Sequence, residues 1–198
     1  MSRMTGHQHT DDAHGSTRKL TYRDYLRFPD DGRRHELIDG KHYVTPSPIT
    51  RHARLSVRLI KSLADYLELQ PIGEVFGTRF DCVMSFFDVV EPDLALILDD
   101  QKEIITKKNV RGAPALVVEV ASPSTRRRDR RQKRDLYARA GVREYWIVDP
   151  DANSVTVFRR TPGGRLPTAG TLSVEADDTL TTPLLPGFEL KLSHYFRE

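Results

Sequence analysis

The apolar run over 115–120, Ala-Leu-Val-Val-Glu-Val, constrains the fold more than any other segment. Branched apolar residues without alternation are typical of a strand that is covered on both faces. A helix is expected over 125–140, where Gly141 ends the pattern, and a second strand over 144–149. These three segments predict a strand–helix–strand unit with a right-handed crossover. The sequence therefore predicts an α/β fold with a mixed β-sheet flanked by helices.

The segments on either side extend this prediction. Asp39-Gly40 between two short extended segments predicts a hairpin. Leucines at every fourth position from Leu55 to Leu67 predict an amphipathic helix over 50–69. We expect a short helix at 21–27, strands over 34–38, 41–44, 74–80, 82–87, 92–98 and 154–158, a helix or loop over 99–110, and an extra β segment near the C-terminus. Residues 18–198 should form a single domain, and the polar residues 1–17 should form a disordered tail.

The composition is that of a soluble globular protein, with 38% hydrophobic and 30% charged residues. The longest apolar stretches have about the length of a strand and fall short of the ~20 residues of a membrane helix. The first residues lack the apolar core of a signal peptide, and a single cysteine, Cys82, excludes an intrachain disulfide. We therefore expect a cytoplasmic protein without a membrane segment.

Positive charge is concentrated in residues 126–134, where seven basic residues stand against one acid. A run of this density attracts polyanions, nucleic acid first among them. A solvated helix face is the other interpretation of such a run. The arginines that we expect to contact DNA are Arg126, Arg127, Arg130, Arg131 and Arg134.

Glu119 is the exception inside the apolar strand, and an ionised carboxylate there is costly unless a charged group pairs with it. A second carboxylate, Asp93, opens the apolar run 94–98. On the expected helix, stepping back from the apolar residues Leu136 and Tyr137 places Lys133 on the face toward the sheet. Asp93 and Glu119 on adjacent strands could share one magnesium ion, because Mg²⁺ prefers carboxylate oxygens. A buried salt bridge between Glu119 and Lys133, without a catalytic role, is the alternative.

Several motifs together resemble one family. They are Glu91-Pro92-Asp93, residues 117–125, Asp129, Lys133, Tyr137 and residues 141–150, with 35–40, 46–48 and 183–188. The chain resembles the Uma-type putative restriction-endonuclease family of the PD-(D/E)XK nuclease superfamily over roughly residues 20–196. The resemblance implies a restriction-endonuclease-like fold and a divalent-metal-dependent endonuclease that hydrolyses DNA with a metal-activated water.

The resemblance also implies roles for individual residues. Asp93 and Glu119 match the two metal-binding acids, and Glu36 matches an early glutamate that assists the metal through water. The usual lysine position, two residues after the second acid, is Ala121 here, and Lys133 on the helix matches the lysine of this family. Asp129 and Tyr137 lie on the same face as supporting residues.

The expected cofactor is Mg²⁺, with Mn²⁺ as a substitute, and the expected partners are DNA and a second copy in a homodimer. A catalytically silent nucleic-acid-binding or interaction module and a hydrolase of another phosphodiester are the other interpretations.

Overall fold

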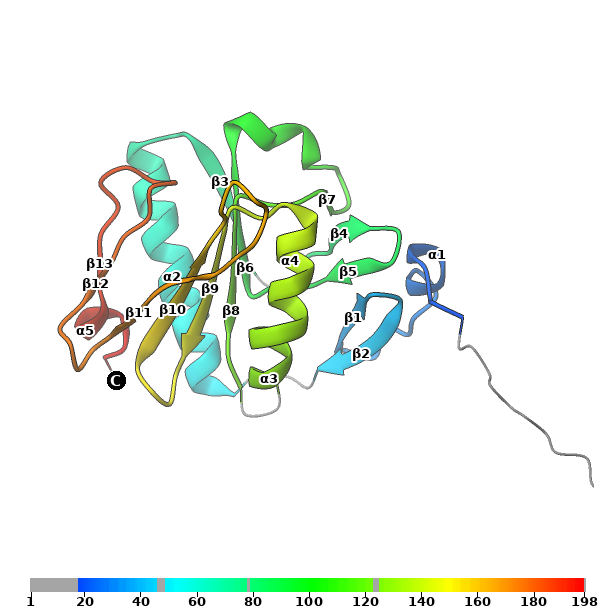
Figure 1. Cartoon of the computed structure of the whole chain (residues 1–198), viewed down its shortest axis with the longest axis horizontal. Coiled ribbons are helices and arrows are strands. Elements are labelled where there is room, and N and C mark those ends of the chain that lie inside the picture. The colour runs from blue at the N-terminus through cyan, green and yellow to red at the C-terminus, as the bar shows by residue number, and fades with distance from the viewer. Residues whose placement is uncertain (1–17, 46–48, 78, 123–124, 198) are drawn as a thin grey trace, which may run out of the picture.

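The computed structural model describes residues 18–45, 49–77, 79–122 and 125–197 (Figure 1). The expected tail at 1–17 and the Pro46–Pro48 part of the family motif lie outside the described residues. Within these ranges, no helix has the length and apolar character needed to cross a bilayer.

The larger sheet has six strands in the order β11-β10-β9-β8-β6-β3. Their bounds are β3 (Gly73–Gly77), β6 (Leu94–Leu98), β8 (Leu116–Val120), β9 (Glu144–Asp149), β10 (Ser154–Arg159) and β11 (Thr168–Ser173). β8 and β9 are parallel, whereas the other pairs are antiparallel. The predicted mixed sheet is therefore confirmed.

A second sheet, of five strands, lies beside the first in the order β2-β1-β5-β4-β7 (Figure 1). Its strands are β1 (Arg34–Ile38), β2 (Lys41–Thr45), β4 (Cys82–Ser85), β5 (Asp88–Val90) and β7 (Val110–Arg111). The predicted hairpin forms β1 and β2, and both Asp39 and Gly40 have positive φ angles, as an Asp-Gly turn of this type requires. The sequence predicted a single sheet, because the alternation within a strand does not reveal its partner.

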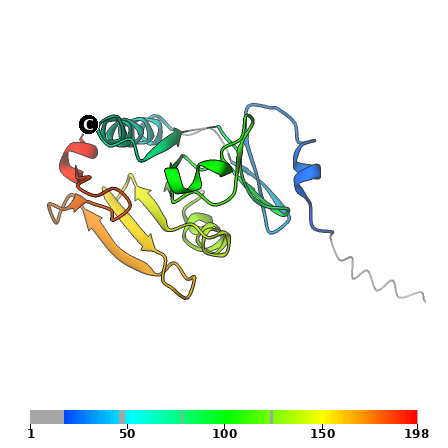
Figure 2. The ribbon, with the colours of Figure 1, turned by 90° about the horizontal axis from the view of Figure 1, so that it is seen from above.

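Helices cover both faces of the larger sheet (Figure 2). α2 (Thr50–Leu69) packs through Leu55, Leu59 and Leu63 on the face that carries Val118 and Val120. On the other face, Leu136 and Tyr137 pack with Val117 and Ala121. They belong to α4 (Arg134–Ala140), which follows α3 (Arg126–Arg128) and a π-helical turn over Asp129–Lys133. The sequence predicted one continuous helix here, and the π turn is a departure from it.

Shorter elements close the ends of the fold. They are α1 (Tyr22–Tyr25), a 3₁₀ helix over Asp99–Ile104, α5 (Leu192–Tyr195), and the pair β12 (Thr179–Leu180) and β13 (Leu190–Lys191). The C-terminal pair is the predicted extra β segment. Leu185, Phe188 and Leu192 from this region join the core beneath α2 and β8.

Candidate active site

Glu119 lies near the carboxyl end of β8 and points toward the face that α3 and α4 cover, because side chains alternate along a strand. Its carboxylate is buried and receives two hydrogen bonds at the same atom. Lys133 Nζ donates to Oε1 at 2.8 Å, and the hydroxyl of Tyr137 donates to it at 2.7 Å. Tyr137 thus helps to orient the acid.

Lys133 is buried, with 2% of its side chain exposed, and forms the centre of the cluster. Its Nζ lies 2.7 Å from Glu36 Oε1, 2.8 Å from Glu119 Oε1 and 4.0 Å from Asp129 Oδ1. Burial lowers the pKa of Lys133, but the three carboxylates outweigh it and raise the pKa above its usual range. The ammonium therefore stays charged. Ala121, in the usual lysine position, is buried in the core on the same face of the sheet.

Glu36 comes from the other sheet. It lies in the middle of β1, is fully buried, and accepts the backbone N–H of Glu91 at 3.2 Å in addition to Lys133. Arg34, two residues earlier, points to the same side because of the strand period. The site therefore lies between the two sheets, and neither sheet contains all of its groups.

Asp93 directly precedes β6, where extending the register of β6 and β8 by one pair places it opposite Glu119. Arg34 Nη2 donates to its Oδ1 at 2.8 Å, and His52 Nε2 and the backbone N–H of Val120 lie 3.0 and 2.8 Å from its Oδ2. Burial raises the pKa of Asp93, but the contacts with His52 and Arg34 outweigh it and lower the pKa to about 2. Asp93 is therefore ionised at neutral pH.

Glu119 behaves in the opposite way. Burial raises its pKa to about 8, because the opposing effect of Lys133 is offset by the negative charges of Asp129, Asp93 and Glu36. Asp129 and Lys133 are both buried in the π turn. Burial also raises the pKa of Asp129. The cluster has more carboxylates than the nearby cations fully neutralise.

Some carboxylate oxygens of the cluster lack a hydrogen-bond partner among the described residues and are available to a cation. No described residue hydrogen-bonds Glu119 Oε2, and Glu36 Oε2 and Asp129 Oδ1 are buried without a hydrogen-bond partner in the described part of the chain. Over the same ranges, no group of three or more His, Cys, Asp or Glu residues is arranged to hold a metal ion. Two carboxylates supplemented by water are the usual protein share of a magnesium site. A bound cation would also favour the ionised form of Glu119, whose pKa is raised in its absence.

The sequence did not predict three residues of the site: Arg34, His52 and Arg128. Arg128 Nη2 donates to Thr45 Oγ1 at 2.7 Å and lies 3.6 Å from Glu36 Oε2. A signal existed for His52, because it lies three residues before Leu55 in the apolar stripe of α2, where a polar residue needs a partner. A signal also existed for Arg34, which shares a strand face with Glu36.

The basic helix divides into distinct groups. Arg126 and Arg130 pair with the last residue of β9, with Nη2 of Arg126 3.0 Å from Asp149 Oδ1 and Nη2 of Arg130 3.8 Å from Asp149 Oδ2. Arg127 and Arg131 are exposed and have no ion-pair partner among the described residues. Arg134 contacts Asp135 at 3.5 Å and lines a pocket of about 410 Å³.

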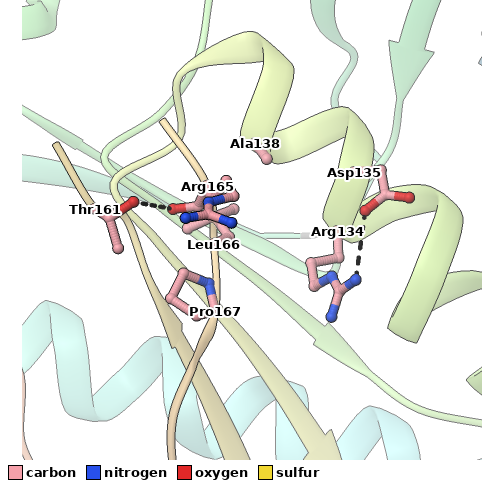
Figure 3. Close-up of a pocket in the computed structure, with 7 residues that line it drawn as sticks. All are labelled: Arg134, Asp135, Ala138, Thr161, Arg165, Leu166 and Pro167. Atoms are coloured by element: carbon pink, nitrogen blue, oxygen red, sulfur yellow. Dashed lines mark hydrogen bonds and ion pairs between the residues drawn. The ribbon is translucent and has the colours of Figure 1, made fainter. Parts of the chain in front are cut away.

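Figure 3 shows this pocket between α4 and the connection from β10 to β11. Arg134 and Ala138 lie on the helix side, and Thr161, Arg165, Leu166 and Pro167 lie on the other. The pocket also contains Asp135, which pairs with Arg134, so its lining combines two guanidinium groups, one carboxylate and an apolar part, and it is distinct from the buried carboxylates.

A comparison with protein families matches residues 22–193 to the Uma2 family, described as "Putative restriction endonuclease". The chain belongs to the Uma2 family. The match covers both sheets, the π turn and the carboxylate cluster, so the family resemblance of the sequence is confirmed.

Two known proteins are similar to this Uma2 chain. A curated protein of Synechocystis sp., "Uncharacterized protein slr1290", is 27% identical over 151 residues, which are 74% of this chain and 77% of that protein. A crystal structure from Anabaena variabilis, described as a putative nuclease belonging to DUF820, has a TM-score of 0.75 at 19% identity and covers 89% of this chain and 97% of its own. The latter similarity confirms the nuclease-like fold.

Proposed function

We propose that this Uma2 chain is a divalent-metal-dependent endonuclease that hydrolyses DNA phosphodiester bonds with a metal-activated water. The observation that carries the proposal is the position of Lys133 Nζ, 2.7 Å from Glu36 and 2.8 Å from Glu119. The superfamily's usual lysine position is occupied by Ala121, and a lysine from the helix reaches the second acid instead. A buried lysine between two acids from different sheets is an expensive arrangement for structure alone.

Asp93 and Glu119 would hold the cation, with Mg²⁺ as the expected ion and Mn²⁺ as a substitute. When bound, the ion would polarise the scissile phosphate and acidify a coordinated water. Lys133 would orient the attacking water and stabilise negative charge on the phosphoryl oxygens. Tyr137 and Lys133 hold Glu119 by the same oxygen, which keeps Oε2 directed away from them.

The arginine-rich helix would bind the DNA backbone. Arg127 and Arg131 have no acidic partner among the described residues, Arg134 contacts Asp135, and Arg126 and Arg130 would have to share their charge with Asp149. A homodimer would supply two sites for two strands. The cytoplasmic location stays a prediction, supported by the single, buried Cys82.

One observation favours the alternative, a nucleic-acid-binding module without activity. Four side chains of the cluster are each at most 3% exposed: Glu36, Asp93, Glu119 and Lys133. Ion pairs buried to this degree can stabilise a fold without taking part in a reaction. An activity measurement separates the two candidates.

The test is nicking of supercoiled plasmid with Mg²⁺ or Mn²⁺ and with EDTA. Asp93→Asn, Glu119→Gln and Lys133→Met should each reduce metal-dependent nicking by ~10²-fold or more. Glu68→Gln removes an exposed carboxylate of α2 and serves as the matched control. Wild-type protein that binds DNA but never nicks it would support the silent module, and nicking that survives all three changes would show that the site is wrongly assigned.

A further inference from the structure

The carboxylate cluster is closed, and its partly exposed members are two arginines. The side chains of Arg34 and Arg128 are each 15% exposed, whereas those of Asp93, Glu119 and Lys133 are exposed by at most 3%. A phosphodiester that approaches the cluster would therefore meet guanidinium groups before it met the acids.

The two arginines converge on one point of the hairpin. Arg34 lies on β1 directly opposite Thr45 on β2. Arg128 reaches across from α3 and donates to Thr45 Oγ1 at 2.7 Å. Its guanidinium carbon also lies 5.3 Å from the centre of the Tyr43 ring, a contact that restrains the plane of the group. Arg34 and Arg128 thus border the cluster from different elements, and each keeps part of its side chain exposed.

Arg128 is held loosely by its acid. Its Nη2 lies 3.6 Å from Glu36 Oε2, beyond hydrogen-bond distance, and its buried Nε has no hydrogen-bond partner in the described chain. Glu36 keeps Lys133 at 2.7 Å on its other oxygen. The guanidinium could therefore move away from Glu36, and that carboxylate would still be paired with Lys133.

Arg34 is in a comparable position. Asp93 loses only its Oδ1 contact when Arg34 turns away, because His52 and the Val120 N–H remain on Oδ2. A guanidinium presents parallel N–H donors that match two phosphate oxygens. Both arginines could therefore exchange a carboxylate for a phosphate.

We propose that Arg34 and Arg128, at the partly exposed edge of the cluster, form a phosphodiester-binding pair that receives the phosphate to be cleaved. This inference rests on the proposed function, because it assigns the substrate phosphate to that same site. It adds two residues, from β1 and α3, that contact the substrate directly, beside the acids and the lysine.

The binding test uses the dinucleotide TpT and its uncharged methylphosphonate analogue, titrated in EDTA and followed by NMR shifts. Wild-type protein should bind TpT and not the analogue. Arg128→Gln and Arg34→Lys should weaken TpT binding by roughly tenfold to a hundredfold, since a charge-assisted hydrogen-bond pair is lost. Arg34→Lys keeps the charge beside Asp93, and the melting temperature of each variant confirms that it is folded.

Arg54→Gln is the matched control, because Arg54 is exposed on the first turn of α2 and has no ion-pair partner among the described residues. Equal binding of TpT by the wild type, Arg128→Gln and Arg34→Lys would overturn the proposal, as would equal binding of the neutral analogue or an equal loss in Arg54→Gln. TpT binding that depends on both arginines in a protein that does not nick plasmid would refute the nuclease and keep the phosphate site.

Discussion

Burial acts on Asp93 and Glu119 alike, yet their pKa values move in opposite directions. Asp93 has Arg34, His52 and a backbone N–H for its two oxygens, whereas Glu119 shares Lys133 with Glu36. The result is one acid that is always ionised and one with a pKa of about 8. The two acids therefore differ in how they respond to pH and to cations.

The metal-free protein should lose stability as the pH rises from 5 to 9. The folded pKa of Glu119, about 8, is above its ordinary value of 4.5, so its stabilising contribution is complete below 4.5 and is lost as the pH rises through 8. Asp93, with a lowered pKa, changes only in strong acid. Thermal unfolding in EDTA should show a steeper fall for the wild type than for Glu119→Gln, and parallel curves would contradict the raised pKa. The gain in melting temperature on adding Mn²⁺ should grow over the same range.

His52 should be a positioning residue for Asp93. Its Nε2 lies 3.0 Å from Oδ2, so His52→Ala should lower the affinity for Mn²⁺ by roughly 10–100-fold, as for other residues that orient a metal ligand. Calorimetric titration of Mn²⁺ measures this directly. His52→Gln can restore a donor to Asp93 and should recover part of the affinity, which a purely structural role would not explain. Val57→Ala, at an exposed position of the same helix, is the control.

At the scale of elements, local sequence patterns predicted individual helices and hairpins but not how the strands are divided between sheets. The leucine stripe predicted α2 with its observed bounds, and Asp39-Gly40 predicted the hairpin. The division into two sheets, the short β5 and the π turn were not predicted, because they depend on contacts far apart in the sequence. Lys133 could be placed beside Glu119 from helix spacing, whereas Arg128 could not be distinguished from its six basic neighbours.

The π turn should be essential to the site. Asp129 and Lys133 are both buried on the sheet side, and π turns are frequent at functional sites. Inserting one alanine after the exposed Gln132 would put Asp129 and Lys133 five residues apart, about 140° around an α-helix, and would separate one of the two residues from the cluster. We expect nicking to be lost while circular dichroism keeps its helical signal. Gln132→Ala keeps the length of the turn and should keep the activity. An insertion variant that is fully active would show that this spacing is dispensable.

The outer face of the basic helix should set the salt dependence of DNA binding. If Arg127 and Arg131 each contact a phosphate, as the proposed function requires, replacing both with Gln should make the slope of log affinity against log salt shallower by about 2. Anisotropy of a labelled duplex at several salt concentrations measures the slope. Arg23→Gln with Arg27→Gln, in α1 and just after it, makes the same change in net charge away from the basic helix. An unchanged slope in the helix variant would place the DNA on another face.

At the scale of the whole molecule, the C-terminal region packs in the hydrophobic core, away from the candidate site. Phe188 is 4% exposed and its ring packs at 88° to that of Tyr66, with 5.8 Å between the centroids. Glu144 connects the same region to β9, since Thr182 and Trp146 both donate to its Oε2 at 2.7 and 3.1 Å. The larger sheet thus depends on residues more than 60 positions after Glu119 in the sequence.

Phe188→Ala should lower the free energy of unfolding by about 3–5 kcal/mol, because it removes a buried aromatic side chain and leaves a cavity. Urea denaturation measures the change. Phe86→Ala, at a ring that is 54% exposed, should have a much smaller effect. Similar losses in both variants would mean that the C-terminal region does not pack as described.

The division of the site between two sheets has a consequence for synthesis. Arg34 and Glu36 leave the ribosome early, the arginine-rich helix follows, and Leu185, Phe188 and Leu192 arrive last. The acids on the larger sheet gain their full support only when those final residues pack. Under the proposed function, a nascent chain would therefore attract polyanions before its acid cluster was complete.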